Sequence, residues 1–219
     1  MTLRLRHSTN PFNESSLVEN YEDWYQTEGS RADRQEKSLL NKLLSSFPSA
    51  HSILEVGCGT GHFMRWFEKT RGLQALGLDV SRPMLKKAVE FGSMFLIQGN
   101  AQRLPLKSNS VDLVALITTL EFLTDPNSAL KEAYRVARKG FIAGVINKNS
   151  ILGIRYKRSG GPIWGNAHLY STSMLKKMAL KSIGHNVDIL WCTTLWPLIP
   201  MYLPLPWGGF IGMAVKWNK

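Results

Sequence analysis

Between residues 52 and 147, short apolar runs of strand length alternate with segments of helical pattern. Helical patterns follow the first, second and fourth of these runs. Strands that alternate with helices are joined by crossovers, which place them in a parallel sheet covered by helices on both faces. The chain is therefore predicted to form a doubly wound α/β sheet. Its strands are expected at SILEV (52–56), QALGLDV (74–80), MFLIQGN (94–100), VDLVALI (111–117) and FIAGVIN (141–147).

Helix starts are marked by capping residues. Ser81 with Pro83 predicts an N-cap, and Asp125-Pro126 is expected to cap and start the helix NSALKEAYRVA. Beyond Asn147 the pattern loosens into a Gly-rich, basic excursion, followed by a helix at 171–184 and two closing strands, NVDILWCT and FIGMAVKW. The segment before the first strand is predicted to be helical.

Cysteine usage and the N-terminal segment narrow the class of protein. Cys58 and Cys192 lie far apart and form no CxxC or Cys/His spacing, so neither a disulfide framework nor a metal site is predicted. The start, MTLRLRHSTNPFNESS, lacks the apolar segment of a secretory signal. A cytoplasmic protein is expected.

The net charge of +11 is spread unevenly. Residues 131–219 hold 13 Lys and Arg against two acids, Glu132 and Asp188, and the rest of the chain is close to neutral. Such a region either meets an acidic partner, substrate or surface, or is only a solvated face. Both interpretations stay open.

The stretch ILEVGCGTGHF places Gly57, Gly59 and Gly61 directly after the first strand, where open α/β sheets bind ligands. A dinucleotide-binding loop needs GxGxxG, and here His62 stands where the third glycine would be. A phosphate-binding loop ends in Gly-Lys-Ser/Thr, and no lysine is present. What remains is GxGxG with Glu55 two residues before it.

This loop and three later segments, in the same order, resemble the class I S-adenosylmethionine-dependent methyltransferases. The likeness is greatest to their small-molecule branch, the type 11 group similar to enzymes of ubiquinone and menaquinone biosynthesis, and it covers roughly residues 20 to 185. It implies a Rossmann-like, seven-stranded sheet that is mostly parallel with a C-terminal antiparallel strand. It also implies S-adenosyl-L-methionine as cofactor and S-adenosyl-L-homocysteine as product. The four segments are LEVGCGTG, GLDVS, QGNAQRLPLKSNSVDLV and ALITTLEFLTDPNSALKEAYRVARKG.

The resemblance implies a cofactor site, residue by residue. The glycine loop would cup the methionine part, Asp79 would accept hydrogen bonds from the ribose hydroxyls, and Met84 would pack near adenine. Cys58 is expected to be a small residue of the loop rather than a nucleophile. The implied set is Glu55, Gly57, Cys58, Gly59, Gly61, Asp79, Val80, Met84, Asn100, Ala101 and Thr118.

The sequence departs from the family pattern in three places. Asn100 stands where the family has an acid that reads the adenine edge, although its amide oxygen can still accept a hydrogen bond. Glu121 and Phe122 stand where the family usually has histidine, and the usual Pro-Gly-Gly before the fifth strand is reduced to RKGF. The last two departures leave the substrate open.

Candidates on the substrate side come from position alone, because methyl transfer needs alignment and requires a base only when the nucleophile is protonated. Tyr21, Trp24 and Tyr25 share one helix face. Tyr21 and Trp24 are expected to line the cofactor pocket, although core packing explains the same spacing. The excursion after the fifth strand holds the candidates for a base or hydrogen-bond donor: His168, Tyr156 and Tyr170, with Asn147, Arg155 and Trp164 beside them.

Residues 189–215 contain no charged side chain. Four prolines oppose a membrane span, so the middle of this run is expected to be covered by the domain, a partner subunit, a hydrophobic substrate or a membrane interface. Together with the basic C-terminal region, it favours peripheral contact with an anionic membrane or an amphiphilic anionic substrate.

The sequence thus predicts one domain over residues 1–219, with cap helices at 1–50, the S-adenosylmethionine-binding half at 51–147, and a substrate-side excursion with closing strands at 148–219. Its predicted function is methyl transfer to a small or amphiphilic acceptor, for which the charge suggests an anionic group. One alternative is a methyltransferase acting on nucleic acid, favoured by the charge but without a recognisable binding module. The other is a non-catalytic S-adenosylmethionine-binding sensor or subunit.

Overall fold

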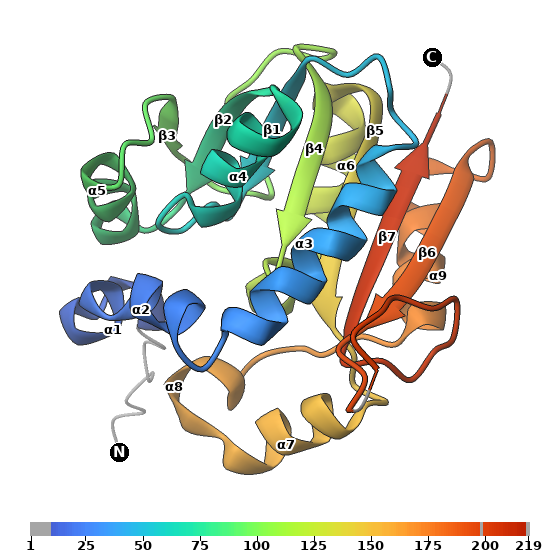
Figure 1. Cartoon of the computed structure of the whole chain (residues 1–219). Coiled ribbons are helices and arrows are strands. Elements are labelled where there is room, and N and C mark those ends of the chain that lie inside the picture. Colours follow the sequence, from blue (N-terminus) through green and yellow to red (C-terminus); the bar gives the residue numbers. More distant parts are fainter. Residues whose placement is uncertain (1–9, 198, 218–219) are drawn as a thin grey trace, which may run out of the picture.

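A seven-stranded sheet forms the centre of the protein, for which the computed structural model describes residues 10–197 and 199–217 (Figure 1). The strand order is β3-β2-β1-β4-β5-β7-β6, and β7 runs antiparallel to both its neighbours while the other pairs are parallel. The predicted Rossmann-like sheet with an antiparallel C-terminal strand is confirmed. The strands are β1 (Ser52–Val56), β2 (Gln74–Asp79), β3 (Leu96–Gln98), β4 (Val111–Ile117), β5 (Ala137–Ile146), β6 (Asp188–Thr194) and β7 (Phe210–Lys216).

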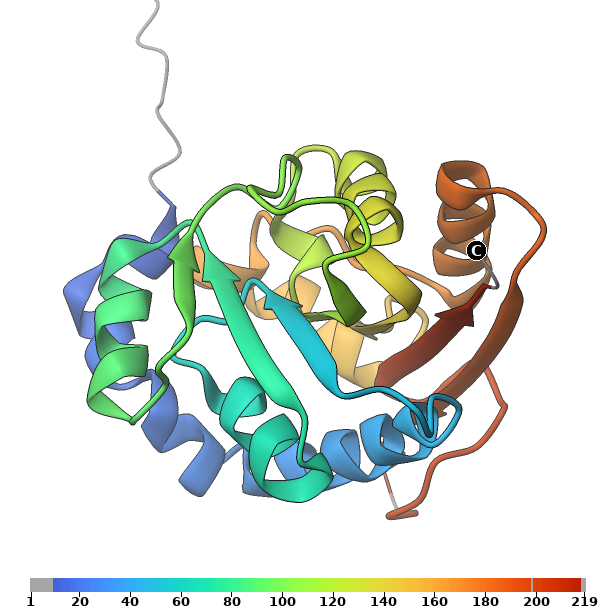
Figure 2. The same cartoon turned by 90° about the horizontal axis from the view of Figure 1, so that it is seen from above.

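Helices cover both faces of this sheet (Figure 2). On one face α3 packs on β5, β6 and β7 while α4 packs on β1 and β2, and on the other face α6 packs on β4, β5 and α9. The helices are η1 (Pro11–Asn13), α1 (Ser15–Glu19), α2 (Tyr21–Gln26), α3 (Ser30–Leu44), α4 (His62–Arg71), α5 (Arg82–Glu90), η2 (Leu120–Phe122), α6 (Pro126–Val136), α7 (Ile151–Ser159), α8 (Gly161–Trp164) and α9 (Thr172–Ile183).

Local sequence explains where these elements begin. The side chain of Ser81 accepts a hydrogen bond from the Met84 amide, and that of Asp125 accepts from the amides of Asn127 and Ser128, so both predicted caps are confirmed. The predicted start of the fifth strand was wrong, because β5 begins at Ala137, directly after α6.

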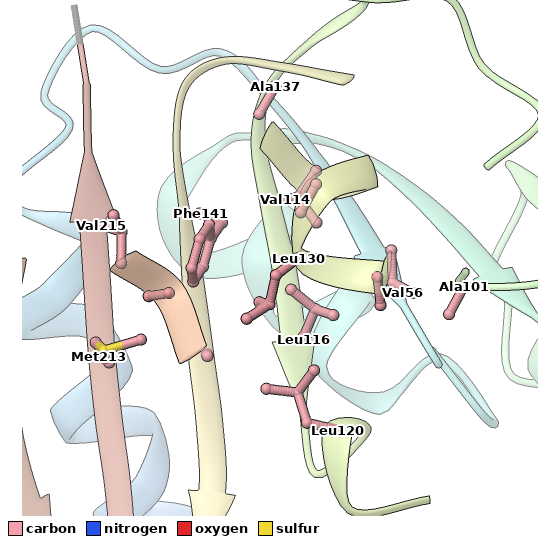
Figure 3. Packing of buried hydrophobic residues seen from close by; sticks show 14 of the residues in the cluster. Val56, Ala101, Val114, Leu116, Leu120, Leu130, Ala137, Phe141, Met213 and Val215 are labelled. Atoms are coloured by element: carbon pink, nitrogen blue, oxygen red, sulfur yellow. The ribbon is translucent and has the colours of Figure 1, made fainter. Parts of the chain in front are cut away.

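Apolar side chains fill both sides of the sheet. Around β4 and β5, side chains such as Val114, Leu116 and Phe141 pack against Leu130 of α6, and Figure 3 shows this cluster. A second cluster joins the opposite face to α3 and α4. All seven residues of β4 are buried, as expected for a central parallel strand covered on both faces.

The order of the strands reverses at β1, which lies between β2 and β4. Ligands of open α/β sheets bind beyond the carboxyl ends of the strands at such a point. Figure 1 shows α1, α2, α7 and α8 at this end of the sheet. These four helices therefore cover the expected site.

The uncharged connection between β6 and β7 folds back onto β6. Thr193 and Leu203 exchange two backbone hydrogen bonds of 2.8 Å, and the Asn147 side chain donates to the carbonyls of Pro206 and Gly208. Other side chains of the connection stay in solvent, with Trp207 60% exposed. Within the described ranges, no helix is long and apolar enough to cross a membrane.

Candidate functional site

A cavity of about 660 Å³ lies beyond the carboxyl ends of the parallel strands. Its wall brings together most of the residues that the sequence selected. The predicted residues that line it are Tyr21, Trp24, Glu55, Gly57, Cys58, Gly59, Asp79, Val80, Met84, Asn100, Ala101, Thr118 and Tyr156. Gly61, His168 and Tyr170 are outside the lining.

We call one part of this wall the loop half, because most of it lies at the ends of neighbouring strands and in the turns that follow them. It comprises Glu55, Gly57, Cys58, Gly59, Asp79, Val80, Met84, Asn100 and Ala101. We call the opposite part the helical half. It comprises Glu36, Ile146, Leu152, Tyr156, Trp164 and Leu195.

The glycine loop requires its glycines for different reasons. Gly57 has φ of +75°, and a Cβ there would lie 2.5 Å from the Thr119 hydroxyl oxygen. Gly59 has φ of +52° and faces the cavity, where a Cβ would meet only the Tyr21 ring at 3.9 Å. Gly61, with φ of +78°, stands directly before α4 and packs against Ser93, so it shapes the turn instead of facing the cavity.

Asp79 fixes this loop from the end of β2. One carboxylate oxygen accepts the Gly59 amide at 2.8 Å, and the other accepts the Ser81 amide at 2.8 Å. Burial raises the pKa of Asp79, although these hydrogen bonds oppose the shift. Each oxygen keeps a free lone pair, so the carboxylate can also accept hydrogen bonds from a bound ligand.

Glu55 places a second carboxyl group in the loop half. Glu55 is 2% exposed, and no residue in the described part of the chain donates a hydrogen bond to its Oε2 atom. Burial raises the pKa of this carboxyl well above its usual value. A buried polar group without a partner is unfavourable for the fold, so this atom is available to a hydrogen-bond donor on a ligand.

Three further residues selected from the sequence line the cavity. Thr118, at the end of β4, has φ of +50°, which is uncommon for a residue other than glycine and often marks a functional site. Asn100 uses its side-chain oxygen to accept the Gln102 amide at 2.8 Å. Burial raises the pKa of the Cys58 thiol, so Cys58 is not an activated nucleophile.

A network of charges attaches the N-terminal helices to the glycine loop. Glu22 of α2 accepts hydrogen bonds from the Thr60 hydroxyl at 2.5 Å and from Arg65 at 2.8 Å, and His62 lies 3.4 Å away. Burial works to raise the pKa of Glu22, but these three partners outweigh it and hold the pKa at about 2. His62 also contacts Asp33 of α3 at 2.7 Å. This network holds α2 and α3 over the cavity.

Aromatic rings form much of the helical half. The rings of Tyr156 and Trp164 stack, with their centroids 4.4 Å apart and their planes at 15° to each other. The ring centroids of Trp164 and Phe122 are 5.7 Å apart. Burial, followed by the negative charge of Glu36, raises the pKa of Tyr156. The helical half therefore offers flat apolar surfaces beside a single carboxyl group.

The remaining predicted residues on the substrate side have other surroundings. The Tyr170 hydroxyl is buried and donates to the Leu120 carbonyl at 3.0 Å, while His168 is exposed and its amide donates to the Glu121 carbonyl. Glu36 was not selected from the sequence. One feature of the sequence could have identified it, because Glu36 is an acid on the apolar face of α3, four residues after Ala32.

The chain matches known methyltransferases in both sequence and structure. Residues 54–143 match the family model described as a methyltransferase domain. The uncharacterized protein MJ1123 of Methanocaldococcus jannaschii is 31% identical over 177 residues, which are 76% of this chain and 80% of that protein. Demethylmenaquinone methyltransferase of Lactiplantibacillus plantarum is 40% identical over 103 residues, which are 42% of each chain. The chain thus matches less than half of that named enzyme.

Solved structures extend the likeness over nearly the whole chain. A SAM-dependent methyltransferase of Thermotoga maritima, described as a possible histamine N-methyltransferase, superposes with a TM-score of 0.77 at 27% identity, covering 93% of this chain and 97% of its own. The plantazolicin methyltransferase BpumL, solved with SAH, has a TM-score of 0.69 over 97% of this chain and 94% of its own, and at 12% identity it shows the fold alone. With the sequence matches, these likenesses make the chain a member of the class I S-adenosylmethionine-dependent methyltransferases, in their small-molecule branch.

Proposed function

We propose that the loop half of the cavity holds S-adenosylmethionine and that the helical half holds a small-molecule acceptor. The observation that carries this proposal is one continuous cavity whose lining includes both the carboxyl groups and glycines of the loop half and the aromatic rings of the helical half. The residues of the polar end fit the cofactor, because the unpartnered Glu55 carboxyl matches an ammonium group and Asp79 has lone pairs left for two hydroxyls. Gly59 leaves the backbone open to close approach.

The bound cofactor supplies a methyl group that its sulfonium already activates for in-line displacement. The work left to the protein is to align the acceptor and exclude water. Tyr21 and Trp24 of α2 line the cavity from the N-terminal cap, and Trp164 of α8 lines it from the other end of the chain. These rings support a role in closing the site over a small acceptor.

The charge of the wall bears on the acceptor. Among the described lining residues there are three carboxyl groups, on Glu36, Glu55 and Asp79, and no Lys or Arg. An anionic acceptor, which the basic C-terminal region suggested, is therefore disfavoured in the cavity itself. The positive charge lies outside the lining, where it meets solvent or a surface.

Calorimetric titration with S-adenosylhomocysteine tests the cofactor half of the proposal. We expect the wild-type protein to bind and Glu55→Gln to bind about tenfold more weakly, because an amide no longer provides a charge for an ammonium group. Glu68→Gln, on α4 outside the lining, is the matched control and should bind normally. Equal affinity of Glu55→Gln and wild type would contradict the assignment.

Assays of S-adenosylhomocysteine release test the acceptor half. We expect release with a low-molecular-weight cell extract, and this release should survive nuclease treatment. Release that depends on RNA or DNA would instead support the alternative of a nucleic-acid methyltransferase.

A second proposal concerns an exposed apolar surface beside α7, which we call the α7 surface. Ile151 and Ile154 are exposed on α7, as are Leu205 and Trp207 in the neighbouring connection. The cations Lys148, Arg155, Lys157 and Arg158 surround the first two. This combination supports peripheral contact with an anionic membrane.

Vesicle flotation at low salt tests the α7 surface. We expect co-flotation with phosphatidylcholine vesicles that contain phosphatidylglycerol, and a weaker signal without it. Trp207→Ser should reduce binding, whereas Val89→Ser, an exposed apolar residue of α5, should not. Absence of binding to anionic vesicles would exclude this proposal.

A further inference from the structure

The carboxyl group of Glu36 is buried in the helical half of the cavity. Glu36 is 6% exposed and lies on α3 one turn after Ala32, which also lines the cavity. Within the described ranges, no hydrogen bond or ion pair reaches its carboxyl oxygens. Neither oxygen is fully shielded from solvent, since neither is among the buried side-chain atoms that lack a partner. The carboxyl therefore opens onto the cavity, where a ligand can provide its partner.

The surroundings of Glu36 are acidic and aromatic. Two acids act on its carboxyl electrostatically, Asp33 on the same helix and Glu121 of η2. Glu36 in turn raises the pKa of Tyr25 in α2 and of Tyr156 in α7. The neighbouring cation Lys37 is held by Asp33 at 2.8 Å. Burial first, and then Asp33 and Glu121, raise the pKa of Glu36 to about 8. Such a site favours a cation that can also give up a proton.

Aromatic faces beside a carboxyl group are the ordinary means by which proteins bind ammonium groups. Tyr156 and Trp164 provide stacked rings in the same half of the cavity as Glu36. Resting on the function proposed above, we propose that the acceptor is a small amine whose ammonium nitrogen binds Glu36 and becomes the methylated atom.

Glu36 then has a chemical role as well as a binding role. An ammonium nitrogen has no free electron pair, so it must first transfer one proton to the Glu36 carboxylate. The freed pair forms the new N–C bond while the C–S bond breaks, and the electron pair of the C–S bond stays on sulfur. The products are a methylated ammonium and S-adenosylhomocysteine, and the proton on Glu36 returns to water.

Calorimetry on the S-adenosylhomocysteine-loaded protein tests this proposal without relying on turnover. The probes are phenethylamine and 2-phenylethanol, which share a ring and chain but differ in charge. We expect the amine to bind about tenfold more tightly at pH 7. Because Glu36 with a pKa of about 8 is mostly protonated at that pH, binding should also release about one proton, measured in buffers of different ionisation enthalpy.

Two variants separate Glu36 from buried acids in general. Glu36→Gln should lose both the amine preference and the proton release, with unchanged affinity for S-adenosylhomocysteine. Asp112→Asn is the matched control, since Asp112 is also a buried acid but lies outside the lining and is not among the charges that act on Glu36. It should keep both properties.

The outcomes are distinct from those of the proposed function. If the wild type prefers the amine no more than the alcohol, or if Glu36→Gln keeps the preference and the proton release, the amine proposal is overturned. Failure of the wild type to bind S-adenosylhomocysteine at all would overturn the proposed function instead.

Discussion

The loop half and the helical half of the cavity are built in different ways. The ends of neighbouring strands and the turns after them form most of the loop half, and the Gly59 amide donates to Asp79 within it. Side chains from α3, β5, α7, α8 and the segment after β6 form the helical half, so its residues extend from Glu36 to Leu195. A surface made by backbone turns leaves a local motif in the sequence, whereas a surface made by distant side chains does not. On the function proposed above, the first surface specifies the cofactor and the second specifies the acceptor.

Asp79→Ala should give the largest effect and should affect the loop half alone. We expect affinity for S-adenosylhomocysteine to fall about a thousandfold, because the loop loses two charge-assisted hydrogen bonds and the ligand loses its acceptor, together worth about 4 kcal/mol. Calorimetry measures this fall.

Asp125→Ala is the matched control for Asp79→Ala. Asp125 also accepts hydrogen bonds from two backbone amides, but it lies on the surface and outside the lining. Its replacement should leave ligand affinity unchanged. Equal losses in the two variants would mean that Asp79 acts only through general stability.

Gly57→Ala should destabilise the fold by about 3 kcal/mol, since it combines an unfavourable positive φ with a collision against Thr119. Gly92→Ala separates the two causes, because Gly92 has φ of +89° and open space around it. This control should lose only about 1 kcal/mol. Urea denaturation measures both, and equal losses would show that close packing at Gly57 contributes nothing.

The attachment of the cap should depend on pH through Glu22. A pKa lowered to about 2 means that the ionised carboxylate contributes fully above its usual value of 4.5, and that this contribution is lost as the pH falls toward 2. We expect Glu22→Gln to be about 2 kcal/mol less stable than wild type at pH 7. In urea denaturation at pH 3 the difference should be smaller. A difference independent of pH would contradict the ion-pair account.

The sequence predicted the centre of the fold well, because buried parallel strands are continuous apolar runs. β1 and β4 have the predicted bounds. The predicted strand bounds were wrong where a strand contains charged residues, or where an apolar run does not form a strand. β5 includes Arg138 and Lys139, and the Arg138 guanidinium reaches Asp112 at 3.0 Å outside the core. Conversely, β3 leaves out Met94 and Phe95, which are apolar but exposed.

The site divides in the same manner. Glu55 and Gly59 were selected from the segment LEVGCGTG and Asp79 from GLDVS, and all three line the cavity. On the substrate side, Tyr156 lines the cavity. His168 does not line it, and its backbone amide donates to the Glu121 carbonyl. Residue type in a loop cannot say which side chain turns inward. That choice depends on how α7 and α8 fold over the end of the sheet.

The smallest effect should come from the aromatic wall of the helical half. Trp164 stacks on Tyr156 and bears no charge, so it can contribute apolar contact and attraction to a cation but cannot take up a proton. We expect Trp164→Ala to weaken phenethylamine binding to the S-adenosylhomocysteine complex about fivefold, or about 1 kcal/mol, while proton release stays at its wild-type value. Trp164→Phe keeps a ring beside Tyr156 and should recover most of the affinity. Because Glu36→Gln is expected to remove the proton release and Trp164→Ala to retain it, calorimetry separates the charged part of the helical half from its apolar part. Loss of proton release in Trp164→Ala would mean that the ring, and not the carboxyl alone, sets the protonation of the bound amine.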